Sequence, residues 1–146
     1  MIVLDTTVLV YAVGGGHPLR EPSRRLVDAI GQGHVMATTT VEVVQEFAHV
    51  YARRRSRQDA ADRAADFATL LGPLVHPDEA DLRRGLELFV AHASLGAFDA
   101  VLAAIVLNTQ HLTAVVSADA AFGDIPGLRW LDPAVGDVVS AAAAHA

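Results

Sequence analysis

Two aspartates stand where predicted strands of the chain end. Asp5 directly follows the apolar run Ile2–Leu4, and Asp119 comes two residues after the run Val115-Val116-Ser117. Parallel sheets of α/β proteins place their binding sites outside the carboxyl ends of the strands. We therefore expect the two carboxylates to lie close together in a site at one edge of a sheet.

Two further acids are embedded in apolar helical sequence. Glu46 lies between Val43 and Val50, at three- and four-residue spacing, so it borders the buried face of a predicted helix. Asp99 lies near the start of the most apolar predicted helix, residues 97–108. A lone carboxylate in such surroundings is costly to bury, so it must be protonated or find a partner.

A divalent cation is the partner that suits these acids. The chain has no lysine, because all 11 of its Lys and Arg residues are arginine, and residues 85–146 contain only Arg129. Carboxylates brought together repel by about 4 kcal/mol per close pair at an effective dielectric constant of about 20. Oxygen ligands without histidine or cysteine favour Mg²⁺ or Mn²⁺ over zinc. Such a cation can activate water and hold a phosphate, which is the chemistry of phosphodiester hydrolysis.

Each acid also has a structural interpretation as a cap of a turn or helix, or as an ordinary loop residue. The membership of the set is open at two places. Glu42, one helical turn before Glu46, could be the second acid. Asp124 could take the place of Asp119 or assist it through water.

Length and composition exclude several other chemistries. A chain of 146 residues is expected to form a single domain, residues 1–146, with a large core, since 52% of its residues are hydrophobic. The absence of cysteine excludes disulfides, thiolate metal sites and a cysteine nucleophile. The absence of lysine excludes a P-loop, a Schiff base and the lysine of phosphoaspartate enzymes.

The net charge of −6 excludes nucleic-acid binding by bulk attraction. A local patch of positive charge remains, made of Arg53, Arg54, Arg55, Arg57 and Arg63, of which the first four are the candidate RNA contacts. Its ordinary interpretation is a solvated helix end and turn. Its functional interpretation is a contact with RNA phosphates.

Strand-like and helical segments alternate along the chain, which is typical of an α/β domain with a mostly parallel sheet. Besides 2–4, strands are predicted at 34–37, 74–76, 113–117 and 128–131, and helices at 21–30, 41–54, 57–71, 78–92 and 97–108. An alanine-rich tail follows from about residue 140. No apolar run approaches the roughly 20 residues that cross a bilayer, so we expect a cytoplasmic protein that does not bind membranes.

The order and spacing of the acids carry a resemblance to a known family. They occur successively in the segments VLDTTVLVYA, TTTVEVVQEFAHV, GAFDAVLAAIV and LTAVVSADAAF. This pattern resembles the PIN-domain nucleases and, in its short single-domain form, the VapC toxins of bacterial toxin–antitoxin pairs. The resemblance extends from Ile2 to around Leu131.

The resemblance implies a PIN-like three-layer fold, in which helices flank a small, mostly parallel sheet. It implies an endoribonuclease that hydrolyses RNA phosphodiester bonds with Mg²⁺, or Mn²⁺. The catalytic and metal-binding residues that match the motif are Asp5, Glu46, Asp99 and Asp119, supported by Thr7 and Ser117. In our hypothesis Asp5 and Asp99 hold the principal ion, while the other two acids complete the pocket or orient the attacking water.

The partners that the resemblance implies are an RNA substrate, a VapB-like antitoxin protein and a second copy of the chain in a homodimer. Two other interpretations fit the sequence less well. A haloacid-dehalogenase-like phosphatase needs a second aspartate where this chain has Thr7, and a lysine that it lacks. A degenerate PIN-like or receiver-like binding module without catalysis is the alternative that does not involve an enzyme.

Overall fold

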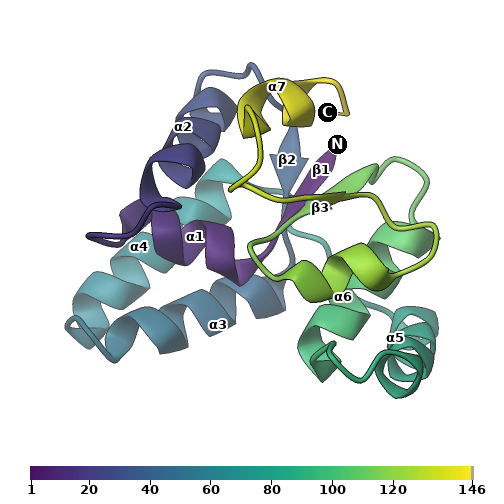
Figure 1. The fold of residues 1–146 in the computed structure, drawn as a ribbon. Coiled ribbons are helices and arrows are strands. Elements are labelled where there is room, and N and C mark those ends of the chain that lie inside the picture. The colour runs from purple at the N-terminus through teal and green to yellow at the C-terminus, as the bar shows by residue number, and fades with distance from the viewer. Residues whose placement is uncertain (146) are drawn as a thin grey trace.

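A four-stranded parallel sheet runs through the centre of the fold (Figure 1). The computed structural model describes residues 1–145; Ala146, the last residue of the predicted domain, lies outside them. The strands are β1 (Ile2–Leu4), β2 (Ala37–Thr38), β3 (Ala114–Val116) and β4 (Trp130–Leu131), in the order β2-β1-β3-β4. β1 and β3 are buried along their whole length, as parallel strands covered on both faces must be.

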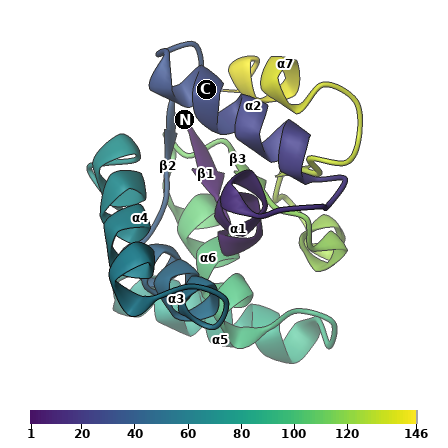
Figure 2. The same ribbon diagram turned by 90° about the vertical axis from the view of Figure 1, so that its left-hand side faces the viewer.

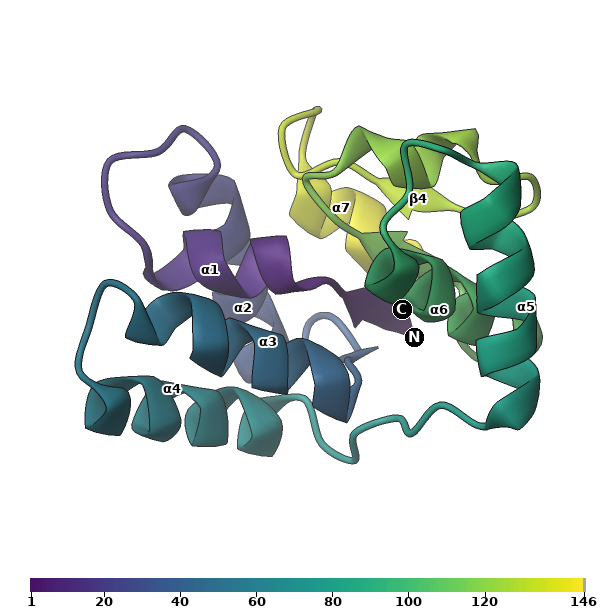
Figure 3. The same cartoon turned by 90° about the horizontal axis from the view of Figure 1, so that it is seen from below.

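Helices cover both faces of this sheet. Figure 1 shows α1 (Thr6–Val13) and α2 (Arg20–Gly31) on one side of the strands, and α5 (Glu79–Ala91) and α6 (Ala97–Asn108) on the other. α3 (Val41–Ala52) and α4 (Arg57–Leu70) pack side by side (Figure 3). α7 (Val138–Ala143) lies beside α2 (Figure 2), and a short 3-10 helix, η1 (Ala120–Asp124), follows β3. The predicted α/β class, with a parallel sheet flanked by helices, is confirmed.

Side-chain caps explain where three of the helices begin. Thr40 accepts a hydrogen bond from the backbone N–H of Val43 (3.2 Å) at the start of α3. Ser56 accepts one from Asp59 (3.0 Å) at the start of α4, as its sequence position predicts. α5 begins with a capping box, in which the side chains of Asp78 and Asp81 each accept from the other's backbone N–H.

Two predicted strands differ from the structure. The prediction of a strand at 74–76 is wrong, because only Val75 pairs, in an isolated bridge with Thr40. Thr40 is the N-cap of α3, so the chain turns into that helix before it can pair further with residues 74–76. The strand predicted at 34–37 is displaced toward the C-terminus and contains Ala37 and Thr38, which are the residues in register with Ile2 and Val3 of β1.

Two α-helices, in addition to the short η1, were not predicted. Residues 6–13 form α1 immediately after β1, although their β-branched and apolar residues resemble a strand. The alanine-rich tail is partly ordered as α7, which Asp137 caps by accepting from Val139 (3.2 Å). Val138 and Ala142 of α7 are buried, so the C-terminal segment contributes to the core. No helix within residues 1–145 is long and apolar enough to span a membrane.

Gly85 lets α5 approach α6 closely, and its replacement tests this packing. A Cβ atom there would lie 2.7 Å from Cγ2 and 2.8 Å from Cα of Val101. Because Cα belongs to the backbone of α6, a change of side-chain rotamer cannot remove this clash. Gly85→Ala is expected to lower the free energy of unfolding, because overpacking costs about 1–3 kcal/mol while alanine gains about 1 kcal/mol in helix propensity. Urea denaturation measures this change.

The matched control is Gly31→Ala at the end of α2. Its new Cβ would meet only the Cδ1 atom of Leu70, at an ordinary 3.8 Å. Equal stability of the two variants would contradict the close approach of α5 and α6.

Candidate active site

Asp5 is the most firmly held of the predicted acids. It leaves the end of β1 and caps α1, and only 3% of its surface is exposed. Its carboxylate accepts hydrogen bonds from Thr6 N (2.6 Å), Thr7 Oγ1 (2.7 Å), Ser117 Oγ (2.7 Å) and Thr7 N (3.3 Å). Burial raises the pKa of Asp5, and the hydrogen bonds from Ser117 and Thr7 oppose that rise. The structural role of this residue as a cap thus coincides with its place in the site.

Thr7 and Ser117 join the ends of the two central strands. Besides donating to Asp5, the Thr7 hydroxyl accepts from the backbone N–H of Ala118 (3.0 Å). The Ser117 hydroxyl accepts from the backbone N–H of Asp119 (3.0 Å). The Asp119 carboxylate in turn caps η1 by accepting from Ala121 N (2.9 Å). The two hydroxyls therefore fix the loop after β3, and with it the position of Asp119, against Asp5.

Glu46 approaches the same point from α3. Its Oε2 atom accepts a hydrogen bond from the hydroxyl of Thr6 (2.7 Å), which ties α3 to the first residue of α1. Sequence reasoning missed this contribution of Thr6. The adjacent Thr7 matched a motif, whereas nothing in the local pattern marks Thr6.

Asp99, in the first turn of α6, completes the group. Burial, followed by the negative charges of Asp5, Asp119 and Glu46, raises the pKa of Asp99 to about 7. The acids come from the ends of two strands and from two helices. All of them line one cavity of about 310 Å³, together with Thr6, Thr7, Val10, Tyr11, Val50 and Arg54.

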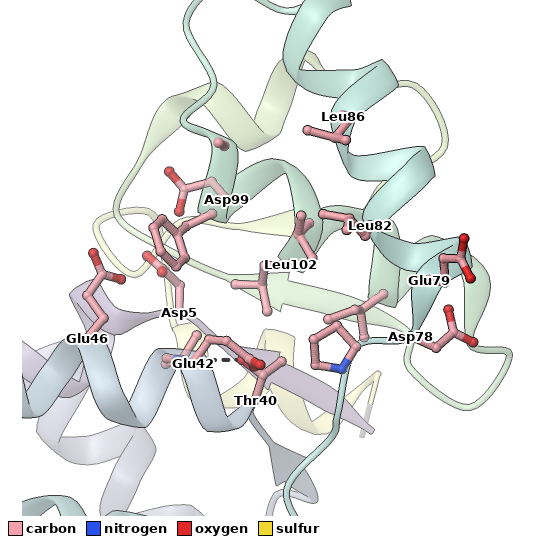
Figure 4. Close-up of a pocket in the computed structure, with 16 residues that line it drawn as sticks. Asp5, Thr40, Glu42, Glu46, Asp78, Glu79, Leu82, Leu86, Asp99 and Leu102 are labelled. Carbon is pink, nitrogen blue, oxygen red and sulfur yellow. Dashed lines mark hydrogen bonds between the residues drawn. The ribbon is translucent and has the colours of Figure 1, made fainter.

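A second, larger cavity of about 530 Å³ adjoins the first, since Asp5, Glu46 and Asp99 line both. Figure 4 shows these carboxylates at one end, the side chains of Leu82, Leu86 and Leu102 next to them, and Asp78 and Glu79 beyond Leu82. The site therefore has an acidic part and an apolar part. The apolar part lies between α3 on one side and α5 and α6 on the other.

The structure separates the alternatives that the sequence leaves open. Glu42 lines the larger cavity but not the one that the other acids share. Its Oε2 atom is buried and has no hydrogen-bond partner among residues 1–145. Asp124 is exposed and lines neither cavity. Of the predicted RNA-contact arginines, Arg54 lines the smaller cavity, and Arg53, Arg55 and Arg57 line neither.

The donor set of the smaller cavity fits a hard divalent cation. It offers carboxylates and hydroxyls, its lining includes no histidine, and the chain has no cysteine. As the side chains stand, no three acidic or histidine residues within 1–145 are close enough to ligate a single ion. A bound cation would nevertheless offset the negative charges of Asp5, Asp119 and Glu46, which add to burial in raising the pKa of Asp99.

The raised pKa of Asp99 predicts how stability depends on pH in metal-free buffer. Its ordinary value is 3.8, so between that pH and about 7 the folded protein keeps a proton that the unfolded chain loses. This contribution to stability is present at low pH and is lost as the pH rises through about 7. We expect the unfolding temperature to fall between pH 5 and pH 8, and to fall less in the Asp99→Asn variant.

Differential scanning fluorimetry with EDTA present measures both curves. A residual slope is expected in Asp99→Asn, because the pKa of Asp5 is raised as well. Parallel curves for the two proteins would show that Asp99 titrates normally in the folded state.

Comparison with known proteins defines the class to which this fold and site belong. The family model described as PIN domain matches residues 2–128, which include all of the acids above. The chain therefore belongs to the PIN-domain family.

Individual relatives extend the match over nearly the whole chain. Ribonuclease VapC7 of Mycobacterium tuberculosis is 48% identical over 149 aligned residues, which cover 96% of this chain and 97% of that protein. Ribonuclease VapC13 of the same organism is 28% identical and covers 90% of this chain and 99% of its own length. Ribonuclease VapC23 is 32% identical, covering 68% of this chain and 78% of that protein. The resemblance to VapC-like members of the family is thus confirmed.

Proposed function

We propose that this chain is a metal-dependent endoribonuclease and the toxic component of a toxin–antitoxin pair. The observation that carries the proposal is the convergence of Asp5, Glu46, Asp99 and Asp119 on one cavity. Burial, followed by the negative charges of the other three acids, raises the pKa of Asp99 to about 7. The relatives named VapC ribonucleases support the same activity.

Asp5 and Asp99 would hold Mg²⁺, or Mn²⁺, with Asp119 and Glu46 completing the set. When bound, the ion activates water and offsets the charge of the phosphodiester. The chain's own residues keep the ligands in place: Thr7 and Ser117 orient Asp5, and Thr6 orients Glu46. Loss of a hydroxyl that orients a metal ligand in this way commonly lowers metal affinity or activity by about 10–100-fold.

The proposed partners are RNA in the cytoplasm, a VapB-like antitoxin and a second copy of the chain. Exposed apolar side chains support the protein partners. Leu82, Leu86, Phe89 and Val90 lie at three- and four-residue spacing on α5, and Val90 is 84% exposed. Phe98, at the start of α6, is 70% exposed. Contiguous apolar surface of this kind is typical of a protein–protein interface.

The test is cleavage of single-stranded RNA by the purified chain in Mg²⁺, with the Asp5→Asn variant purified in parallel. Discrete fragments from the wild-type chain and none from the variant are expected. Equal cleavage by both proteins would contradict the proposed site. RNA binding without cleavage would favour the alternative, a PIN-like binding module.

A further inference from the structure

We propose that Arg54 and Tyr11 form a subsite for one unpaired nucleotide beside the scissile phosphate. Arg54 contacts the phosphate of that nucleotide, and Tyr11 stacks on its base. The inference rests on the proposed ribonuclease function and specifies where the RNA strand runs.

Arg54 is the one basic residue in the lining of the acidic cavity. Although it shares that lining with Asp5, Glu46 and Asp99, its guanidinium forms no ion pair or hydrogen bond with any side chain among residues 1–145. A phosphodiester that approaches so many carboxylates is repelled by them. A guanidinium that is not neutralised by those carboxylates offers the paired N–H donors that bind phosphate oxygens best.

Tyr11 lines the same cavity from α1. Its ring is stacked on that of His17, with ring centroids 4.3 Å apart and an interplanar angle of 18°. Val10 and Val50 line the space near it. RNA-binding proteins commonly hold unpaired bases by stacking them on aromatic side chains, in surroundings that are otherwise apolar.

The helical spacing places this subsite at a defined step from the acids. Tyr11 follows Thr7 by four residues on α1, and Arg54 follows Glu46 by eight residues along and just beyond α3. The four-residue spacing keeps Tyr11 on the face of α1 that carries Thr7, while Arg54 stands in the turn that follows α3. At a rise of 1.5 Å per residue, Tyr11 lies about 6 Å along α1 from Thr7, which places it beside the acids rather than among them.

The neighbouring arginines provide matched controls. Arg53 and Arg55 flank Arg54, carry the same charge and are exposed like it, but they line neither cavity. Arg53 lies instead within hydrogen-bond distance of His49 (3.0 Å). A general effect of positive charge on RNA affinity would therefore be equal for all three residues, whereas a subsite depends on Arg54 alone.

The first experiment measures binding of a short fluorescent single-stranded RNA in the cleavage-deficient Asp5→Asn background. Adding Arg54→Ala is expected to raise the dissociation constant about 10-fold and to reduce the salt slope of log K by about 0.7. Adding Arg53→Ala or Arg55→Ala is expected to change the constant less than about twofold. Equal affinities for the Arg54→Ala and Arg55→Ala proteins would overturn the subsite.

The second experiment addresses Tyr11 with an RNA that lacks the base next to the cleaved bond. Loss of that base is expected to slow the wild-type chain about 10-fold, and to slow the Tyr11→Leu variant no further. Tyr11→Phe is expected to retain the wild-type response, since it keeps the ring. Equal sensitivity of wild type and Tyr11→Leu to the missing base would exclude stacking.

These outcomes are separate from the fate of the proposed function. Cleavage that depends on Asp5 but not on Arg54 leaves the ribonuclease in place and removes the subsite. Conversely, Arg54-dependent RNA binding by a chain that never cleaves RNA retains the subsite and removes the catalytic proposal.

Discussion

Replacing Asp5 with asparagine is expected to abolish RNA cleavage while leaving the chain folded. The carboxylate is proposed to bind the principal cation, whose stabilisation of the transition state is worth several kcal/mol. Since each 1.36 kcal/mol is a factor of ten in rate, the loss should reach about 1000-fold. An amide of the same shape carries no charge to offset that of the cation.

The fold should survive because asparagine retains most of the contacts of Asp5. Its carbonyl oxygen can still accept from Thr6 N and cap α1, while its amide can donate to the hydroxyls of Thr7 and Ser117. Circular dichroism and the unfolding temperature provide the control. A folded Asp5→Asn protein with full activity would contradict the proposed site.

Removal of divalent cations is expected to stop cleavage by the wild-type chain as completely as the Asp5 substitution does. EDTA should abolish the activity, and excess Mg²⁺ or Mn²⁺ should restore it. The same cations should raise the unfolding temperature of the wild-type chain at pH 8, because a ligand that binds only the folded state stabilises it. The gain should be greatly reduced in Asp99→Asn.

The thermal measurement makes the metal prediction independent of RNA. Calcium, which has a larger radius and tolerates other geometries, is the comparison ion for both readouts. Cleavage that continues unchanged in EDTA would contradict metal dependence. A cation-induced shift of equal size in wild type and Asp99→Asn would place the ion elsewhere.

The sequence predicted the elements whose signals are local and strong. α6 was predicted at 97–108, the residues that form it, because it is apolar nearly all round and ends at a polar turn. α1 was not predicted, because Thr6, Thr7, Val8 and Val10 are β-branched residues that favour strands. The cap from Asp5 and burial against α2 and α3 override that preference.

The positions of the acids were predictable because they follow from topology. Adjacent parallel strands end at one edge, so Asp5 and the segment after β3 had to meet. That Arg54 alone of the four arginines lines the acidic cavity was not predictable. It depends on the residue at which α3 ends and on the direction in which the chain then turns toward α4. Tyr11 belongs to a helix that the sequence did not indicate, so its place in the cavity could not be inferred either.

The unequal structural duties of Asp5 and Asp99 bear on how such a protein loses its activity during evolution. A change at Asp5 to a residue other than asparagine removes acceptors that hold α1 and the loop after β3, so inactivation there carries a folding cost. A neutral residue in place of Asp99 relieves the repulsion from the neighbouring acids. It also leaves the start of α6 intact, because the N-cap of that helix is Gly96. Cells that escape a harmful nuclease by point mutation would therefore keep more intact protein when the change falls at Asp99. Such a protein would remain able to bind its partners.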